Sequence, residues 1–373
     1  NINLANTLTM TGGNITFNNP VILTAASIIN AGSGAVTFNS TVNGAFNLTA
    51  IAGTFNLSGA WGASTALGNV SLTYTNSISL PSIRASSIVA RTTGATSDIT
   101  IASGKVLTAS GTGDAIKLAA GRNFINNSGA GALSTPAGRW LVYSSSPSSD
   151  TIGGLSNSFR RFSCTYGGSC PTVPATGNGL LYTTTPLLTV TPNSITDIVY
   201  GSAAPNLNNY AYGISGYLGG DAAVDSVTGN INGATNYAQG ASVGDYLLSY
   251  RDGNLVSSMG YGFSYTSNAN AFKVMPAALT VTANNVNKTY GSGDPALTYK
   301  ISGLMNGDTA SVMRGSLSRM AGNVVGAYQI IKNTLATNSN YTLANYIPGQ
   351  FTVLSNDIPA TVTRVSQDPS LNM

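Results

Sequence analysis

Short runs of alternating apolar and polar residues follow one another through residues 1–137, and Gly, Asn or Ser separates each run from the next. Alternation of this kind predicts β-strands that bury one face. The strands recur at intervals of about 20 residues, which is typical of a solenoid whose coils bury their apolar faces only by stacking. The clearest strands are at residues 14–17, 35–38, 46–49, 70–74, 99–101 and 116–118.

The pattern predicts an all-β chain that opens with a right-handed parallel β-helix over residues 1–137. An antiparallel β-sandwich remains as the alternative reading. We favour the β-helix because most of the turns lack hairpin dipeptides such as Asn-Gly. The first residues resemble the middle of a repeat, so we expect these coils to be the last ones of a longer solenoid.

Charge is scarce in the chain and absent from its start. Only 8% of the residues are charged, against about a quarter in ordinary soluble proteins, and the first charged residue is Arg84. Like charges repeated from coil to coil would repel one another, whereas Asn and Thr can form hydrogen-bonded ladders. The net charge of +4 is too small and dispersed for a nucleic-acid surface. No apolar run reaches the length of a membrane-spanning helix.

Residues 138–186 read as a cap and connector. The segment begins with the more aromatic run 138–144, and we expect Trp140 and Tyr143 to cover the last coil of the solenoid. Cys164 and Cys170 follow, and in an exported protein they would form a disulfide. A metal site is disfavoured, because the chain has no His and no third Cys.

The rest of the chain contains an internal repeat, which predicts two small tandem β-modules of sandwich or β-grasp type at 187–276 and 277–354. Residues 355–373 read as a linker or tail. The matched features keep their order along both modules. They are Leu188–Thr191 with Leu279–Thr282, Tyr200-Gly201-Ser202 with Tyr290-Gly291-Ser292, Gly220-Asp221 with Gly307-Asp308, Val243–Tyr246 with Val325–Tyr328, and Phe272 and Val274 with Phe351 and Val353.

Two segments resemble parts of known surface proteins. The run 138–144, followed by Pro147 and the segment 153–155, is similar to the end of the β-helix in filamentous-haemagglutinin-like adhesins of bacterial two-partner secretion. The second module, with Lys288–Gly291 and Gly307-Asp308, resembles the MBG/YDG-type repeat of the same proteins. The first module matches less closely, because Ile198-Val199 stands where that repeat has Lys-Thr and an insertion lengthens residues 234–240.

The resemblance implies an extracellular location at a bacterial, outer-membrane-bearing cell surface. It also implies export through an outer-membrane secretion partner and contact with adjacent modules of one long polypeptide. Other expected partners are polysaccharide, a host or neighbouring cell surface, or further copies of the chain. Nucleic acid is not expected.

The residues argue against catalysis and against a cofactor. Asp98 and Asp114 are the only acids of the solenoid region and read as turn residues, and the lack of His excludes His-dependent triads. A ligand surface is instead expected among the aromatic and basic residues that follow the solenoid. Its candidates are Tyr210, Tyr212, Tyr217, Arg160 and Arg161.

Three functions therefore remain open. The first is an adhesin or biofilm-matrix fragment that acts as a surface-projecting stalk and binds multivalently. The second is a structural subunit of an extracellular filament. The third, least favoured by the residues, is a β-helix enzyme acting on polysaccharide.

Overall fold

The computed structural model describes residues 1–357, so most of the expected linker or tail lies outside the described residues. The chain packs into two compact units. The first unit contains residues 1–190, 214–230 and 253–264. The second contains, among the described residues, 191–213, 231–252 and 265–357.

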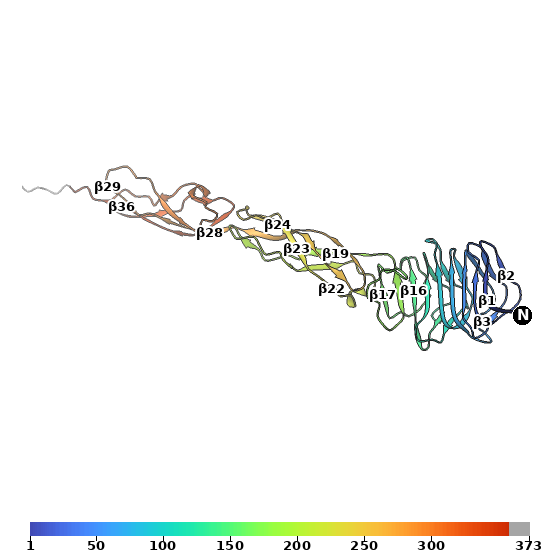
Figure 1. Ribbon diagram of the computed structural model, residues 1–373. Helices are drawn as coiled ribbons and strands as arrows, with labels where there is room; N and C mark the ends of the chain where they lie inside the picture. The colour runs from blue at the N-terminus through green and yellow to red at the C-terminus, as the bar shows by residue number, and fades with distance from the viewer. Residues whose placement is uncertain (358–373) are drawn as a thin grey trace, which may run out of the picture. The chain divides into compact units, whose positions relative to one another are not determined.

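The first unit is built on a parallel β-helix, which confirms the predicted fold class and makes the antiparallel sandwich reading wrong. Its 12-stranded sheet has the main order β1-β3-β6-β8-β10-β13-β16-β18-β17, and every neighbouring pair in this order is parallel (Figure 1). The strands of this sheet are β1 (Ile2–Thr9), β3 (Val21–Asn30), β5 (Val42–Asn43), β6 (Leu48–Ala52), β8 (Leu67–Tyr74), β10 (Ile83–Thr92), β12 (Leu107–Ala109), β13 (Gly113–Ala119), β15 (Leu133–Ser134), β16 (Gly138–Ser144), β17 (Phe159–Arg161) and β18 (Gly179–Tyr182).

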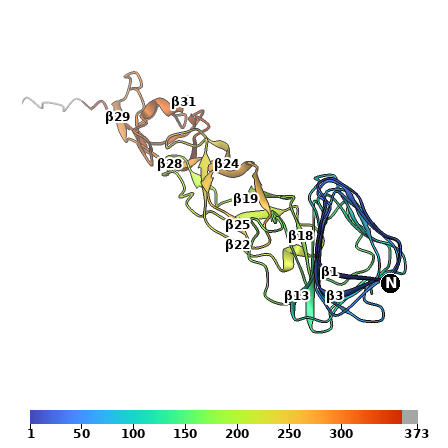
Figure 2. The same ribbon diagram turned by 45° about the vertical axis from the view of Figure 1, so that its right-hand side comes forward.

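Shorter strands complete each coil, and the coils nearly superimpose as a rounded triangle in Figure 2. They form two three-stranded sheets, β2-β4-β7 and β14-β11-β9. Aromatic rings stack between coils inside the triangle, with the ring centroids of Phe17 and Phe38 4.7 Å apart and those of Phe38 and Trp61 5.0 Å apart. These strands are β2 (Ile15–Phe17), β4 (Ala35–Phe38), β7 (Thr54–Leu57), β9 (Ile78–Leu80), β11 (Ile99–Ile101) and β14 (Phe124–Asn126).

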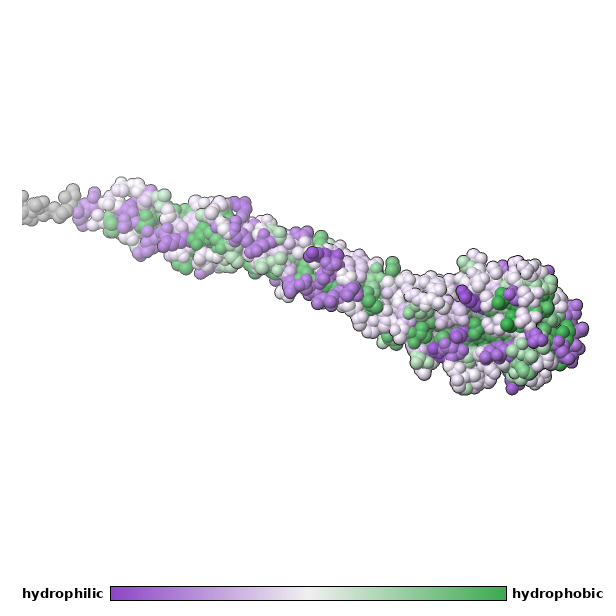
Figure 3. Space-filling model, viewed as in Figure 1, coloured by the Kyte–Doolittle hydropathy of each residue, from purple (hydrophilic) through white to green (hydrophobic). Residues whose placement is uncertain are grey.

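Polar side chains bond from one coil to the next along the outside. Asn39 Nδ2 donates to Asn18 Oδ1 at 2.9 Å, and Asn76 Nδ2 donates to Thr54 Oγ1 at 2.8 Å. The partners of these bonds are 21 and 22 residues apart, one coil along the chain. The side of the solenoid that faces the viewer in Figure 3 shows pale, green and purple areas side by side. Neutral side chains thus link the coils without the repulsion that stacked like charges would cause.

The solenoid continues past residue 137, which corrects the expected position of its cap. Strand β16 pairs with β13 on one side and with β18 on the other, so Trp140 lies inside the stack and is buried. The core continues from there to Phe162, whose ring centroid lies 4.6 Å from that of Tyr261. The end of the stack is therefore covered by residues that are distant in sequence, which is why local aromatic content misplaced the cap.

Asp150 is a half-buried carboxyl group in the last coils, and its pKa provides a test of the packing. It accepts hydrogen bonds from Phe124 N at 2.8 Å and from Ser144 Oγ at 2.6 Å, and burial raises its pKa to about 6 despite these bonds. Because the folded pKa exceeds the unfolded value, this group contributes most to stability below about pH 4, and the contribution is lost as the pH rises through about 6.

We expect Asp150→Asn to stabilise the solenoid by about 2 kcal/mol at pH 7 and to change little near pH 4, since the amide keeps both partners without a charge. Denaturant unfolding followed by tryptophan fluorescence at several pH values measures this. Asp98→Asn is the control of opposite sign, because the hydrogen bond from Arg122 lowers the pKa of Asp98. Equal destabilisation by Asp150→Asn at both pH values would contradict a raised pKa of Asp150.

The first module is divided between the two units rather than forming the single domain 187–276. Residues 214–230 and 253–264 pack with the solenoid, because Tyr217, Met259 and Tyr261 join its apolar core. The sheets of this module have the orders β21-β19-β26, β20-β27-β24-β23 and β22-β25. Its elements are β19 (Leu187–Pro192), β20 (Ile198–Val199), β21 (Tyr212–Ser215), the 3-10 helix η1 (Asp221–Ala223), β22 (Val227–Thr228), β23 (Ile231–Thr235), β24 (Gly244–Gly253), β25 (Val256–Ser257), β26 (Gly262–Tyr265) and β27 (Asn268–Met275).

The second module repeats this arrangement with its own core. Tyr328 pairs with Phe351 as Tyr246 pairs with Phe272, in the same antiparallel register. The sheets have the orders β30-β28-β35, β29-β36-β33-β32 and β31-β34. The elements are β28 (Ala277–Ala283), β29 (Val286–Thr289), β30 (Tyr299–Ser302), the 3-10 helix η2 (Ala310–Val312), β31 (Met313–Arg314), β32 (Ser318–Arg319), β33 (Gly326–Ile331), β34 (Ala336–Thr337), β35 (Tyr341–Ile347) and β36 (Gln350–Leu354).

Candidate ligand site at the end of the solenoid

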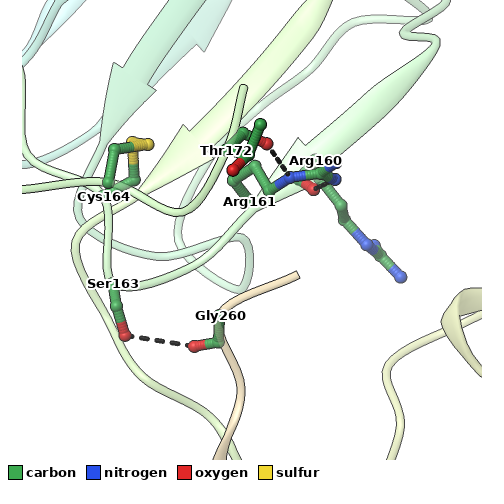
Figure 4. The surroundings of a disulfide bond; sticks show 7 residues. Arg160, Arg161, Ser163, Cys164, Thr172 and Gly260 are labelled. Carbon is green, nitrogen blue, oxygen red and sulfur yellow. Dashed lines mark hydrogen bonds between the residues drawn. A yellow bond between two sulfur atoms is a disulfide. The ribbon is translucent and has the colours of Figure 1, made fainter. Parts of the chain in front are cut away.

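A disulfide loop covers the outer face of the last coils. Cys164 and Cys170 are bonded, and Cys164 is buried against Leu141 and Leu181 in a small apolar cluster outside the coil (Figure 4). Tyr143 belongs to this outer cluster, so it is not a cap residue. The loop therefore fixes the chain that runs from strand β17 into the connector.

Arg160, on strand β17, is part of a buried polar network. Its Nε lies 2.7 Å from Asp221 Oδ1, and its Nη2 also donates to the carbonyl oxygen of Leu218. Asp221 further accepts a hydrogen bond from the hydroxyl of Tyr261, and burial together with this bond raises the pKa of Tyr261 to about 12. The charge of Arg160 is thus paired with Asp221 within the fold, and only its Nη1 has no hydrogen-bond partner among residues 1–357.

The neighbouring Arg161 is placed differently. Its Nε donates to Thr172 O at 3.0 Å and its Nη1 to Arg160 O at 2.8 Å, and the guanidinium lies 5.6 Å from the ring centroid of Phe159. Within residues 1–357 no carboxylate forms an ion pair with Arg161, and its Nη2 has no hydrogen-bond partner. Figure 4 shows Arg161 held beside Thr172 while Arg160 extends away from the disulfide.

Two hollows of about 370 and 310 Å³ meet at Arg161. Hydroxyl and amide side chains line them together with apolar residues, which suits a ligand that carries both hydroxyl groups and a negative charge. The first hollow is lined by Arg161, Pro171, Thr172, Pro174, Val256, Ser257 and Ser258. The second is lined by Asn157, Ser158, Phe159, Arg160, Arg161, Asp221, Val224 and Met259.

The acidic neighbours of Arg161 are already bonded to other groups. Asp225 accepts from the hydroxyls of Ser257 and Ser258 and from the backbone N–H of Met259. Burial lowers the pKa of Arg161, and the field of Asp225 partly offsets that effect. The guanidinium stays charged at neutral pH, because an arginine side chain does not lose its proton in proteins.

The structure does not gather the predicted tyrosines into one surface. Tyr210 is buried, with its hydroxyl 3.2 Å from Ser249 O, and Tyr217 packs against Tyr261 with the ring centroids 5.4 Å apart. Tyr212 is half-buried in the second unit. Of the predicted ligand residues, Arg161 is the one that lines a hollow with a guanidinium that no carboxylate pairs with.

Sequence reasoning did not include Ser257, Ser258 and Asp221 in the site. Asp221 lies 61 residues from Arg160 along the chain, and no local pattern links the two. The sequence signal for Asp221 is the Gly-Asp step that both modules repeat.

The acids of the solenoid have structural partners. Arg122 pairs with Asp98 at 2.7 Å and Arg139 with Asp114 at 2.6 Å, in each case from the following coil. Among the residues that the structure describes, no group of three or more His, Cys, Asp or Glu is placed to hold a metal ion. No helix in the described part of the chain is long and apolar enough to span a membrane.

Comparison with curated proteins and with solved structures gave no match. One family model matches part of the chain, in the segment that begins in strand β28 and ends in strand β36. Residues 279–352 match the MBG domain (YGX type), so the second module is similar to an MBG domain, as the sequence motifs indicated.

Proposed function

We propose that this protein is part of an extracellular bacterial adhesin or biofilm-matrix protein, and that it acts by reach and contact rather than by catalysis. The observation that carries the proposal is the MBG match at residues 279–352 in a chain that begins with a β-helix. MBG domains are typical of extracellular surface proteins. The disulfide between Cys164 and Cys170 supports an oxidising compartment.

The proposal includes export by two-partner secretion through an outer-membrane transporter. Its support is the similarity of residues 138–155 to the end of the β-helix in filamentous-haemagglutinin-like adhesins. In the proposed arrangement the solenoid and the modules are parts of one long surface polypeptide, and repeated weak contacts sum to firm attachment.

The proposed ligand is an acidic polysaccharide, bound at Arg161. A sugar carboxylate or sulfate would accept from the unused Nη2 edge, while Ser257, Ser258 and Asn157 would offer hydrogen bonds to hydroxyl groups. Such a contact is electrostatic in origin, so it weakens as salt is raised.

We expect Arg161→Ala to weaken binding of the full chain to acidic glycans about 30-fold, which corresponds to about 2 kcal/mol for a charge-assisted hydrogen bond. A glycan array identifies the ligand, and titration of the best acidic glycan at two salt concentrations measures the change. Arg161→Lys should recover part of the affinity, because it keeps the charge but loses the planar fork.

Arg84→Ala is the matched control, since Arg84 is exposed on the solenoid and should not affect binding. Unchanged affinity in Arg161→Ala would contradict the site, and a chain that retains no acidic glycan would contradict the ligand class. Concentration-dependent polymerisation of the purified chain without glycan binding would favour a filament subunit instead.

A further inference from the structure

The aspartate of the Gly-Asp step makes the same kind of contact in both modules: its carboxylate accepts a hydrogen bond from a tyrosine hydroxyl. In the second module the Tyr341 hydroxyl lies 2.8 Å from Asp308 Oδ2 and accepts from Met305 N at 2.9 Å. In the first module the Tyr261 hydroxyl donates to Asp221 and accepts from Leu218 N at 3.0 Å. Each module therefore holds a carboxylate beside a tyrosine ring, with a lone pair left for another donor.

That other donor comes, in both modules, from the part of the chain that precedes the module. Arg160 donates to Asp221, and the Tyr200 hydroxyl donates to Asp308 at 3.1 Å. The two contacts lie within the first and the second unit, respectively. The aspartate carboxylate thus accepts hydrogen bonds from chemically different donors at equivalent places in the two modules. This indicates that the contact joins each module to the part of the chain that precedes it.

The contact made by Tyr200 is close and buried. Only 5% of Tyr200 is exposed, and its ring meets that of Tyr341 edge to face with the centroids 5.3 Å apart. Gly201 packs against Met305 so closely that a methyl group on Gly201 would lie 2.6 Å from Met305 Cβ. Tyr200 and Gly201 therefore act together. Tyr200 donates a hydrogen bond, and Gly201, which has no side chain, leaves room for the side chain of Met305.

Tyr290 and Gly291 repeat this pair in the second module. Gly201 and Gly291 share a φ of 87°, which favours glycine at both turns. The backbone N–H of Tyr200 donates to Met275 O at 2.8 Å, and that of Tyr290 donates to Leu354 O at 2.9 Å. The two tyrosines are therefore presented by the same turn on equivalent strands.

Their surroundings differ. Tyr290 is 52% exposed, and a methyl group on Gly291 would meet nothing within 4 Å. In the described part of the chain the Tyr290 hydroxyl has no hydrogen-bond partner, whereas the Tyr200 hydroxyl has Asp308. The second module thus exposes Tyr290 and Gly291, the equivalents of the two residues through which the first module contacts the second. In the described structure no other module covers them.

We propose that Tyr290 and Gly291 form a docking surface for a further module of the same type. The partner is a β-module that carries a Gly-Asp carboxylate beside a tyrosine, as Asp308 lies beside Tyr341. Tyr290 donates its hydroxyl hydrogen to that carboxylate, and a side chain equivalent to Met305 fills the space over Gly291. The argument rests on the contact between Tyr200 and Asp308 and is independent of any ligand at Arg161.

The test extends the full chain with one more copy of residues 276–354 placed directly after Leu354, which reproduces the spacing found after Met275. The added copy carries Tyr290→Phe, so that nitration by tetranitromethane, read by peptide mass spectrometry, gives the reaction rate of the original Tyr290 on its own. We expect the rate of Tyr290 to fall at least fivefold on extension, toward the low rate of Tyr200. Tyr265, which is exposed in the described structure, should keep its rate and serves as the internal control.

Two variants separate the proposed contact from general burial. Asp308→Ala made in the added copy should restore the rate of Tyr290, while protection of the copy's own Tyr341 ring shows that the copy is folded. Asp308→Ala made in the original module should raise the rate of Tyr200 in the same way. An unchanged rate of Tyr290 on extension with a folded copy, or protection of Tyr290 that survives loss of the carboxylate, would overturn the proposal.

Discussion

Asp221→Ala is expected to destabilise the end of the solenoid by about 3 kcal/mol, because it leaves the partly buried Arg160 guanidinium without its counter-charge. The Asp221 side chain is only 7% exposed and that of Arg160 only 24%. The substitution also removes the acceptor for the Tyr261 hydroxyl. The substitution would therefore remove the hydrogen bonds that link strand β17, the η1 segment and the Tyr261 ring.

Tryptophan fluorescence measures this effect selectively. The chain has 2 Trp residues, Trp61 and Trp140, and both are buried in the solenoid. Denaturant unfolding should show a lower midpoint for Asp221→Ala. Asp245→Ala should stay within about 0.5 kcal/mol of the unaltered chain, because its pair with Lys273 is exposed. The Arg160→Ala, Asp221→Ala double variant should lose less than the sum of the single variants, and strict additivity would count against the network.

Gly34→Ala should destabilise the solenoid by about 3 kcal/mol, for a reason that involves backbone alone. A methyl group on Gly34 would lie 2.2 Å from the carbonyl oxygen of Gly13 in the preceding coil. Gly53 faces the carbonyl oxygen of Ser33 at the same distance. Because backbone atoms in hydrogen-bonded coils cannot move aside as a flexible side chain does, the coils must separate locally and lose packing.

Gly131→Ala is the matched control for this prediction, since a methyl group there would meet nothing within 4 Å. Thermal unfolding followed by tryptophan fluorescence compares the two variants. We expect the melting temperature to fall clearly for Gly34→Ala and to stay unchanged for Gly131→Ala. Equal effects of the two substitutions would show that close approach of the coils is not what requires glycine at position 34.

The solenoid could be read from the sequence because its signal is local and repeated. Val36 pairs with Ile15 in the preceding coil and with Phe55 in the following one, so one alternating pattern recurs at each coil. The lack of charge before Arg84 follows from the same repetition. The repeat of the two modules was visible for a similar reason, since each copy keeps the turns that its strands require.

The candidate site was only partly predictable. Arg160 and Arg161 are neighbours with the same side chain, yet the first is bound by Asp221 and the second faces two hollows. The residues that make this difference come from segments 214–230 and 253–264, which pack with the solenoid rather than with the rest of their module. No local sequence pattern indicates such contacts between distant segments.

The sequence by itself determined the strand-rich solenoid, the tandem modules and the MBG-like turns, because alternation and glycine placement act over a few residues. Only the tertiary structure decided where the solenoid ends, which of the two arginines pairs with a carboxylate, and which of the two tyrosine hydroxyls has a hydrogen-bond acceptor. Those outcomes depend on contacts between segments far apart in the chain. Tyr200 and Tyr290 share the local sequence Tyr-Gly-Ser, and the contact with Asp308 distinguishes them.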